Sequence, residues 1–206
     1  MWFQPAFQVW GSAVTWLELV SVVLSLAMVG CNLRVHVAGW PLAMASSVLY
    51  SLLFAHHKLY GEAALQWAFV MLALWGWWQW LRPTSSPQRG PGVSYMSSTQ
   101  RARAAVVTLV AWPLLGRGLS TVTDSDVPYL DALPTVASLT GQWLLAHKRV
   151  ENWWVWLGVN LFSVALFAYK QLWLTAMLYA LFAVLSWVGW RQWRRIFKAT
   201  SSASAA

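Results

Sequence analysis

The segment Gly76-Trp77-Trp78-Gln79-Trp80 returns 113 residues later as Gly189-Trp190-Arg191-Gln192-Trp193. At this offset the stretch from Trp40 to Trp80 aligns with the later part of the chain without a gap and with 13 identities. Shared apolar composition accounts for some Leu and Ala matches, but not for a repeated Gly-Trp-x-Gln-Trp. The identities include Trp40 with Trp153, Phe54-Ala55 with Phe167-Ala168 and Phe69 with Phe182. The chain therefore contains an internal repeat, and the same offset extends it back to Glu18, which falls on Asp131.

The composition indicates a polytopic membrane protein. The chain has 206 residues, of which 59% are hydrophobic and only 10% are charged, too few charges to cover a soluble domain. One cysteine, Cys31, allows no internal disulfide. The net charge is +8, and the basic residues lie between apolar segments. Membrane topology therefore explains this charge better than nucleic-acid binding does. Residues 1–16 lack the basic start and the small-residue cleavage site of a signal peptide.

The apolar runs predict seven membrane-spanning helices. They cover about residues 12–33, 39–55, 62–81, 104–119, 129–146, 151–169 and 173–193. We expect a flexible linker at 82–103, rich in Pro, Gly and Ser, and a kink at Trp112-Pro113 in a short fourth helix. The small-residue tail at 199–206 is expected to be disordered. The whole chain forms a single polytopic domain.

The basic residues predict the orientation in the membrane. With the N-terminus outside, eleven of the 14 lysines and arginines fall in the inner loops and in the C-terminal region. Only Lys58, Arg117 and Lys170 fall outside. This bias places the N-terminus outside and the C-terminus in the cytoplasm.

The repeat also predicts the architecture. Four spans separate each residue from its copy, and an even number means that both halves cross the membrane in the same direction. We therefore expect two parallel three-helix repeats, at about 12–81 and 129–195, joined by a linker and a fourth helix at about 82–119. Parallel repeats of this kind occur in transporters whose substrate site lies between the halves near mid-depth, and which work by alternating access.

Several motifs together resemble those of the PnuC-type vitamin transporters. They are Trp40-Pro41-Leu42, Tyr50, Lys58-Leu59-Tyr60, Gly76–Trp80 and Glu151-Asn152-Trp153-x-x-Trp156. The resemblance covers about residues 18–195, apart from the linker, and implies a fold like that of the SWEET sugar transporters. It implies facilitated diffusion of a phosphate-free vitamin, best known as nicotinamide riboside, across a bacterial inner membrane. A cytoplasmic kinase would trap the substrate, relatives carry thiamine or other vitamins, and the family suggests a small homo-oligomer.

The candidate substrate site centres on Trp153, Trp156 and Asn160. Their spacing of three and four residues places them on one face of a helix. Nicotinamide riboside and thiamine carry a fixed positive charge on a flat ring, which an indole face attracts by about 0.5–2 kcal/mol. Amides and hydroxyls would serve the carboxamide or ribose. The further candidates are Gln66, Gln142, Tyr50, Tyr179, Thr135 and Ser138.

Packing roles compete with these assignments. Tryptophan also anchors helices at membrane interfaces, which applies to Trp153 at the edge of its span. Thr135 and Ser138 fit hydrogen bonds between helices equally well. The repeat mates Glu18 and Asp131 could attract a cationic vitamin or pair with Arg117 and Lys170, but carboxylates so near the outer face more often reach water.

The sequence contains no recognisable catalytic, metal or nucleotide site. His56-His57 lacks a third ligand, and no Gly-x-x-x-x-Gly-Lys run is present. We therefore expect no enzyme, no cofactor and no nucleic-acid partner; the expected partners are the vitamin and the lipid bilayer. A substrate-capture subunit for a separate ATPase is the main rival to a self-sufficient transporter. A receptor would need a signalling domain, and a membrane enzyme would need a catalytic cluster.

Overall fold

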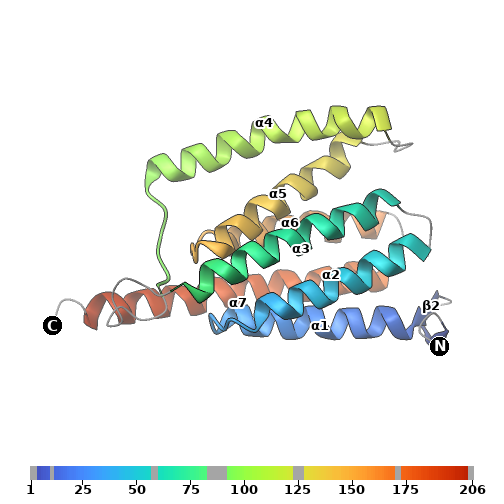
Figure 1. Ribbon diagram of the computed structural model, residues 1–206, viewed down its shortest axis with the longest axis horizontal. Coiled ribbons are helices and arrows are strands. Elements are labelled where there is room, and N and C mark those ends of the chain that lie inside the picture. The colour runs from blue at the N-terminus through green and yellow to red at the C-terminus, as the bar shows by residue number, and fades with distance from the viewer. Residues whose placement is uncertain are drawn as a thin grey trace. The chain divides into compact units, whose positions relative to one another are not determined.

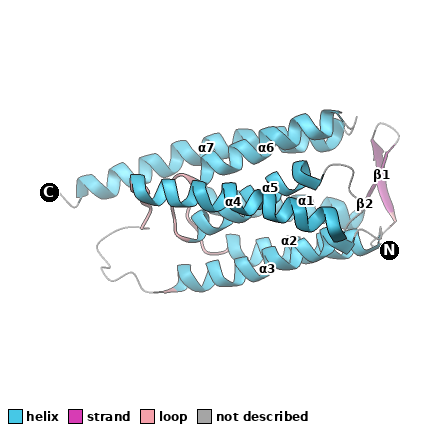
Figure 2. Cartoon of the chain, turned by 90° about the horizontal axis from the view of Figure 1, so that it is seen from above, coloured by secondary structure: helices cyan, strands magenta, loops and turns pink. Residues whose placement is uncertain are grey.

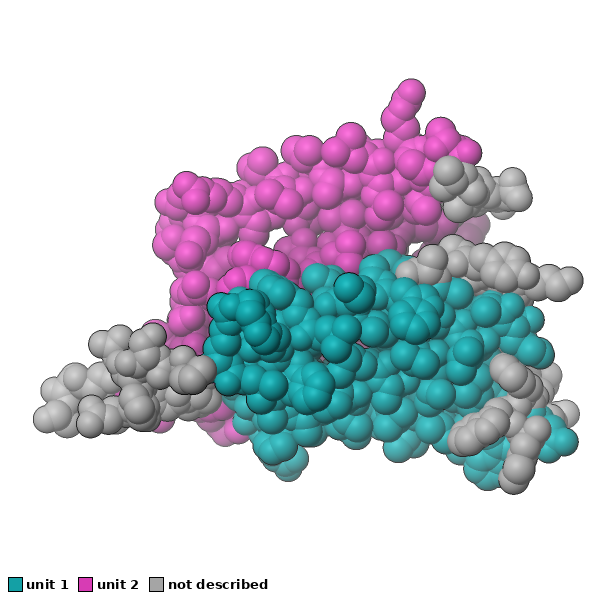
Figure 3. Space-filling model, viewed as in Figure 1, with its two compact units in different colours: residues 1–82 teal, residues 83–206 magenta. Residues whose placement is uncertain are grey.

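The computed structural model describes residues 4–9, 12–56, 60–82, 92–122, 128–169 and 173–203. Within these residues the fold is all-α, with seven helices and one short two-stranded hairpin. The chain divides into two compact units, Met1–Arg82 and Pro83–Ala206 (Figure 3). Each unit contains three helices of one repeat, and the second unit also contains the extra helix.

Unit 1 begins with strands β1 (Pro5–Val9) and β2 (Ser12–Thr15), which pair antiparallel. Helix α1 (Trp16–Leu33), α2 (Gly39–His56) and α3 (Tyr60–Leu81) follow (Figure 2). The prediction of a helix from residue 12 was wrong for the first four residues, which form β2. Helix α1 begins where Thr15 Oγ1 accepts a hydrogen bond from the Glu18 backbone N–H, a Thr-x-x-Glu start signal that the apolar pattern had hidden.

Unit 2 contains α4 (Ser98–Val122), α5 (Pro128–Ala146), α6 (Asn152–Tyr169) and α7 (Trp173–Ala203). The prediction of a short fourth helix was wrong, because α4 has 25 residues and continues past Pro113. The prediction of disorder from residue 199 was also wrong up to Ala203, where α7 ends. The first part of the predicted linker, 83–91, lies outside the described residues.

The two units pack their helices in the same order. In unit 1, α2 contacts both α1 and α3; in unit 2, α6 contacts both α5 and α7. Helix α4 packs along α5 (Figure 1). The middle helix of each triplet thus joins the other two helices of its repeat, and α4 joins unit 2 through α5.

A lock of two tryptophans and a glycine joins α2 to α3. The Trp40 ring lies so close to Gly76 that a Cβ there would come within 2.2 Å of Cη2. Trp40 also meets Trp80 edge to face, with ring centroids 5.4 Å apart. Because only glycine leaves room for the indole, this position decides how closely the two helices approach.

The same lock joins α6 to α7 at positions 113 residues later. Trp153 lies against Gly189, where a Cβ would come within 2.5 Å of the ring, and meets Trp193 edge to face at 5.6 Å. The repeated Gly-Trp-x-Gln-Trp therefore has a packing function: its glycine receives an indole from the neighbouring helix, and its last tryptophan meets that indole edge to face.

The turns before α2 and before α6 are also copies of each other. Val35 and Lys148, which are repeat mates, are the two non-glycine residues with positive φ among the described residues, both at 53°. His36 N–H donates to Cys31 O at 2.9 Å, and Arg149 N–H donates to Leu144 O at 2.9 Å. Both turns are helix C-caps of the Schellman type with a left-handed residue in the position that glycine usually occupies.

The surface of the helices is too apolar for water. On α3 the exposed side chains Trp67, Met71, Leu74, Trp78 and Leu81 follow helical spacing, and α4 and α7 carry similar rows. Such rows on long helices are typical of lipid-facing surfaces. By length and mean hydropathy alone, α1 and most of α4 qualify as membrane spans within the described residues. The tryptophan-rich helices score lower because hydropathy scales rate indole as mildly polar.

Candidate functional site

The three residues of the predicted stripe on α6 have different neighbours. Trp153 is buried and fills the lock against Gly189, and Asn160 is buried and donates from Nδ2 to Ser186 Oγ on α7 at 3.1 Å. Trp156 faces α5 instead, where a Cβ at Gly141 would lie 3.1 Å from its Cε2. Trp153 and Asn160 therefore take part in packing with α7, whereas Trp156 belongs to the contact between α5 and α6.

Three polar candidates lie on one face of α5, the helix that Trp156 contacts. Thr135, Ser138 and Gln142 follow spacings of three and four, so they share one face of the helix, and Ser138 and Gln142 are buried. Gln142 directly follows Gly141, the residue that Trp156 packs against. The Thr135 hydroxyl donates a hydrogen bond to Asp131 O at 2.9 Å. Trp156 thus packs against the helix that carries these groups, at Gly141, which lies one turn from Ser138.

The remaining candidates lie elsewhere on the two units. In unit 1, Tyr50 stacks on Phe54 with ring centroids 6.0 Å apart, and Gln66 is half-buried on α3. In unit 2, Tyr179 meets Phe182 edge to face on α7. The assignment of all nine residues to a substrate site stays a prediction.

The acidic repeat mates occupy equivalent helix starts. Glu18 lies in the first turn of α1 and Asp131 in the first turn of α5. A carboxylate there interacts favourably with the positive end of the helix dipole, by roughly 0.3–1 kcal/mol at exposed sites. This placement supplies a structural reason for both residues.

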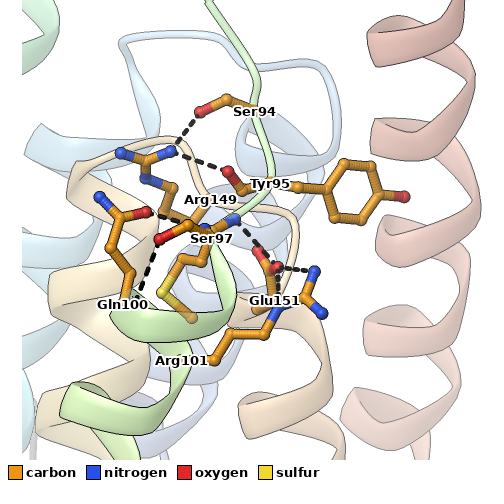
Figure 4. Close-up of polar contacts among 8 residues, drawn as sticks. Ser94, Tyr95, Ser97, Gln100, Arg101, Arg149 and Glu151 are labelled. Carbon is orange, nitrogen blue, oxygen red and sulfur yellow. Dashed lines mark hydrogen bonds and ion pairs between the residues drawn. The ribbon is translucent and has the colours of Figure 1, made fainter.

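A polar clamp that the sequence did not predict links the linker to the start of α6 (Figure 4). Glu151 Oε1 accepts hydrogen bonds from the Met96 backbone N–H at 3.0 Å and from Arg101 Nε at 3.0 Å. Arg101 Nη2 lies 2.9 Å from the same oxygen. The carboxylate of Glu151, at the start of the Glu-Asn-Trp-Trp motif, could have indicated a polar contact here. Its partners could not be predicted, because they are 50 to 55 residues away in sequence.

The clamp continues through Arg149 and the backbone of the linker. Arg149 Nη1 donates to Ser94 Oγ at 2.9 Å and to Tyr95 O at 3.0 Å. Ser94 N–H donates to Lys148 O, and Val150 N–H donates to Ser94 O, which forms a short parallel bridge. The prediction of flexibility is therefore wrong for residues 94–96, because their backbone groups are bonded to Glu151 and to the turn between α5 and α6. In this turn, burial lowers the pKa of Lys148 below its ordinary value.

The described residues contain no group of three His, Cys, Asp or Glu that could hold a metal ion. What the site offers is binding chemistry: buried amides, hydroxyls and indoles between long apolar helices. Together with the lipid-facing surface, these features define the class as a polytopic all-α membrane protein with amides, hydroxyls and indoles buried between its helices.

Comparison with known proteins identifies the family. The nicotinamide mononucleotide transporter family matches residues 15–195, so the chain belongs to this family of multi-pass membrane transporters. It is 30% identical over 166 residues to the riboflavin/roseoflavin transporter RibM of Streptomyces davaonensis, covering 78% of this chain and 76% of RibM. It is 22% identical over 182 residues to the nicotinamide riboside transporter PnuC of Escherichia coli, covering 77% and 76%.

The fold has a counterpart among solved structures. The crystal structure of the vitamin B3 transporter PnuC aligns with a TM-score of 0.71 and 22% identity, covering 89% of this chain and 83% of that one. The all-α, seven-helix fold predicted from the apolar runs is thereby confirmed. As a member of this family, the chain is a vitamin-type transporter of the bacterial inner membrane.

Proposed function

We propose that this protein takes up a phosphate-free vitamin, with nicotinamide riboside as the first candidate, by facilitated diffusion through alternating access. The N-terminus lies outside and the C-terminus in the cytoplasm. A cytoplasmic kinase phosphorylates the vitamin, which keeps it inside and maintains the downhill gradient. The kinase is a functional partner and needs no contact with this chain.

The observation that carries the proposal is that Trp156 packs at Gly141 against α5, the helix that carries the buried Ser138 and Gln142. A cationic nicotinamide ring on an indole gains about 0.5–2 kcal/mol, more where water is excluded. Gln142 offers two donors and an acceptor to a carboxamide or ribose, which supports a substrate with paired polar groups. Buried amides without such partners would cost about 1–3 kcal/mol each, so a ligand that satisfies them binds favourably.

The divergence of the two repeats supports a site on α5. In unit 1, Ser25 Oγ and Ser46 Oγ lie 2.8 Å apart and join α1 to α2. Their repeat mates are Ser138 and Val159, and valine has no hydroxyl. The hydroxyl pair that serves packing in unit 1 thus has no counterpart in unit 2, which leaves Ser138 suited to a ligand.

Riboflavin is the second candidate, favoured by the 30% identity to RibM. Its flavin ring would stack on an indole by burying apolar surface rather than by cation–π attraction, and its ribityl chain would bind the same amides and hydroxyls. Thiamine remains a third candidate because it shares the fixed positive charge. All three are flat heteroaromatic vitamins, so the proposed site chemistry serves each of them.

Binding and transport by the purified protein test the proposal. We would measure calorimetric binding of nicotinamide riboside, riboflavin and thiamine, with nicotinamide mononucleotide as the phosphorylated control, and then uptake into protein-containing liposomes. We expect one vitamin to bind and to equilibrate across the membrane regardless of sodium or proton gradients. Gradient-driven accumulation would contradict facilitated diffusion. Tight binding without any uptake would support a capture subunit instead.

Substitutions test the site itself. Trp156→Ala and Gln142→Ala should each weaken vitamin binding by about tenfold or more. A desolvated cation–π contact contributes about 2 kcal/mol, and loss of Gln142 would leave buried polar groups of the vitamin unsatisfied at a cost of about 1–3 kcal/mol. Trp67→Ala removes an exposed indole from α3 and serves as the matched control. If all three variants bind as the natural protein does, the recognition site lies elsewhere.

A further inference from the structure

An apolar groove runs along α6 on the side away from the predicted substrate stripe. It has a volume of about 620 Å³ and is walled by α4, α5 and α6 within unit 2. Its lining includes Leu109, Ala137, Val155, Gly158 and Phe162, and none of the nine predicted site residues. The groove extends along α6 from Glu151 to Phe162, about 16 Å at 1.5 Å per residue. This length matches one leaflet of a hydrocarbon core about 30 Å thick.

The floor of the groove is open because of a glycine. Gly158 is exposed, and a Cβ placed on it would meet no atom within 4 Å. Glycine in a helix interior costs about 0.5–1 kcal/mol relative to alanine, and here no close helix contact requires it. The space over Gly158 is therefore a feature that packing within this unit does not explain.

A basic hollow lies at the cytoplasmic end of α7, in the proposed orientation. It has a volume of about 180 Å³ and is lined by Trp190, Arg191, Arg194, Arg195 and Lys198. Arg194 lies over the Trp190 ring, 4.5 Å from its centroid. In the part of the chain that the structure describes, no carboxylate lies within ion-pair distance of these four cations. Four uncompensated cations in one place favour an anionic ligand.

Two tryptophans in contact with each other connect the groove to the hollow. Trp154 lines the groove, Trp190 lines the hollow, and their ring centroids lie 5.0 Å apart. Trp187 completes the cluster, 4.8 Å from Trp190, and it is 43% exposed. The exposed apolar row of α7, Met177, Leu181, Val184 and Val188, leads up to this cluster. Tryptophans at the end of a lipid-facing row are typical of the membrane interface.

We propose that the groove and the hollow together bind one anionic phospholipid. An acyl chain occupies the groove over Gly158, and the phosphate headgroup lies in the hollow against Arg194 and Lys198, with the tryptophan cluster at the level of the glycerol. The lipid fills the space between α4 and α6 and neutralises the cations of α7. Membrane charge supports this occupant, since anionic lipids attract clusters of Lys and Arg at the membrane surface.

The test uses the full chain, purified in mild detergent and stripped of lipid. Native mass spectrometry counts bound lipid, and intrinsic fluorescence follows thermal unfolding during titration with phosphatidylglycerol, with phosphatidylcholine of the same chains, or with inorganic phosphate. We expect one phosphatidylglycerol per chain and a rise in unfolding temperature that phosphatidylcholine matches only at about tenfold higher concentration. Equal effects of the two lipids, or of inorganic phosphate alone, would overturn the headgroup assignment.

Two pairs of variants separate the parts of the site. Gly158→Leu fills the groove and should abolish phosphatidylglycerol retention. The protein should stay folded, because a Cβ at this position meets no atom within 4 Å. Gly118→Leu is its control, on α4 outside the groove and equally open. Arg194→Gln with Lys198→Gln should weaken phosphatidylglycerol roughly 10- to 30-fold. Arg103→Gln with Arg117→Gln removes the same charge from other exposed positions and should change little.

The outcomes decide between occupants. Loss of lipid in Gly158→Leu but not in Gly118→Leu supports the acyl-chain groove. Equal retention in both variants overturns it. If the lipid-free protein instead forms a dimer or trimer that Gly158→Leu disrupts, the groove holds a second copy of the chain and the proposal is wrong.

Discussion

The two repeats share their packing and differ in their hydrogen bonds. Each has a tryptophan from its middle helix seated on a glycine of its last helix, and each has a left-handed residue in the turn before the middle helix. The polar pairs do not correspond. Unit 1 joins α1 to α2 through Ser25 and Ser46, whereas unit 2 joins α6 to α7 through Asn160 and Ser186.

This difference separates what builds the fold from what specialises it. Shape complementarity between indole and glycine has been kept in both copies, because any side chain on the glycine would displace the ring. Polar groups can be exchanged between positions as long as each finds a partner, so they diverge. Both units bury polar side chains, Ser21, Ser25 and Asn32 on α1 and Ser138 and Gln142 on α5. The Glu151 clamp has no copy in unit 1, because the repeat mate of Glu151 is Ala38. The two repeats thus share their packing contacts but satisfy their buried polar groups differently.

The largest effect is expected from filling the lock. Gly76→Leu and Gly189→Leu should each destabilise the protein by more than ~3 kcal/mol, because the new side chain collides with the ring of Trp40 or Trp153. Yield of monodisperse protein in detergent measures this loss. Gly30→Leu, where a Cβ meets nothing within 4 Å, is the control. Tolerance of leucine in one repeat alone would show that the two locks are not equivalent.

Trimming the indole tests whether Trp153 has a second role. Neither Trp40 Nε1 nor Trp153 Nε1 has a hydrogen-bond partner, so replacement by Phe removes volume but no hydrogen bond. Trp40→Phe and Trp153→Phe should therefore cost similar amounts, about 1–2 kcal/mol each. Thermal unfolding with and without the vitamin measures both. If only Trp153→Phe also lowers the stabilisation by vitamin, that indole contacts the substrate as well as Gly189.

Introducing glycine into the repeated turns should stabilise the protein, whereas replacing glycine in the locks should destabilise it. Val35→Gly should stabilise unit 1 by about 1 kcal/mol, because a β-branched residue is strained at φ of 53°. Lys148→Gly should gain less, since an unbranched side chain tolerates this conformation better. Chemical unfolding of the two variants in detergent provides the comparison. A loss of stability in Val35→Gly would mean that the Val35 side chain contributes more packing than its strain costs.

The smallest effect is expected in the pH dependence of stability, and it involves only Lys148 in the turn before α6. Burial lowers the pKa of Lys148 in the folded protein below the unfolded value of 10.5, so folding releases a proton in the interval between them. The penalty is fully present below the folded pKa and disappears as pH rises toward 10.5. The stability advantage of Lys148→Met over the natural protein should therefore shrink as pH rises through the lowered pKa toward 10.5. An advantage that stays constant with pH would show that charge burial at Lys148 does not limit stability.

The sequence by itself determined the seven helices, because runs of apolar residues can satisfy their backbone only as helices in lipid. It also revealed the repeat, because the indole–glycine lock admits so few residue types that both copies remain readable at the offset of 113. The start of α1 was readable too, in the Thr15–Glu18 spacing, although the apolar residues around it pointed to an earlier start.

Only the tertiary structure decided which partner each residue of a face meets. Spacing placed Trp153, Trp156 and Asn160 on one stripe, but a helix packed between two others presents that stripe to both, so Trp156 faces α5 while its neighbours face α7. Likewise, the linker contains the same glycines, prolines and serines as a flexible chain. Residues 94–96 are held by Glu151 and Arg149, partners more than 50 residues away, and contacts at that separation arise from the fold rather than from any local pattern.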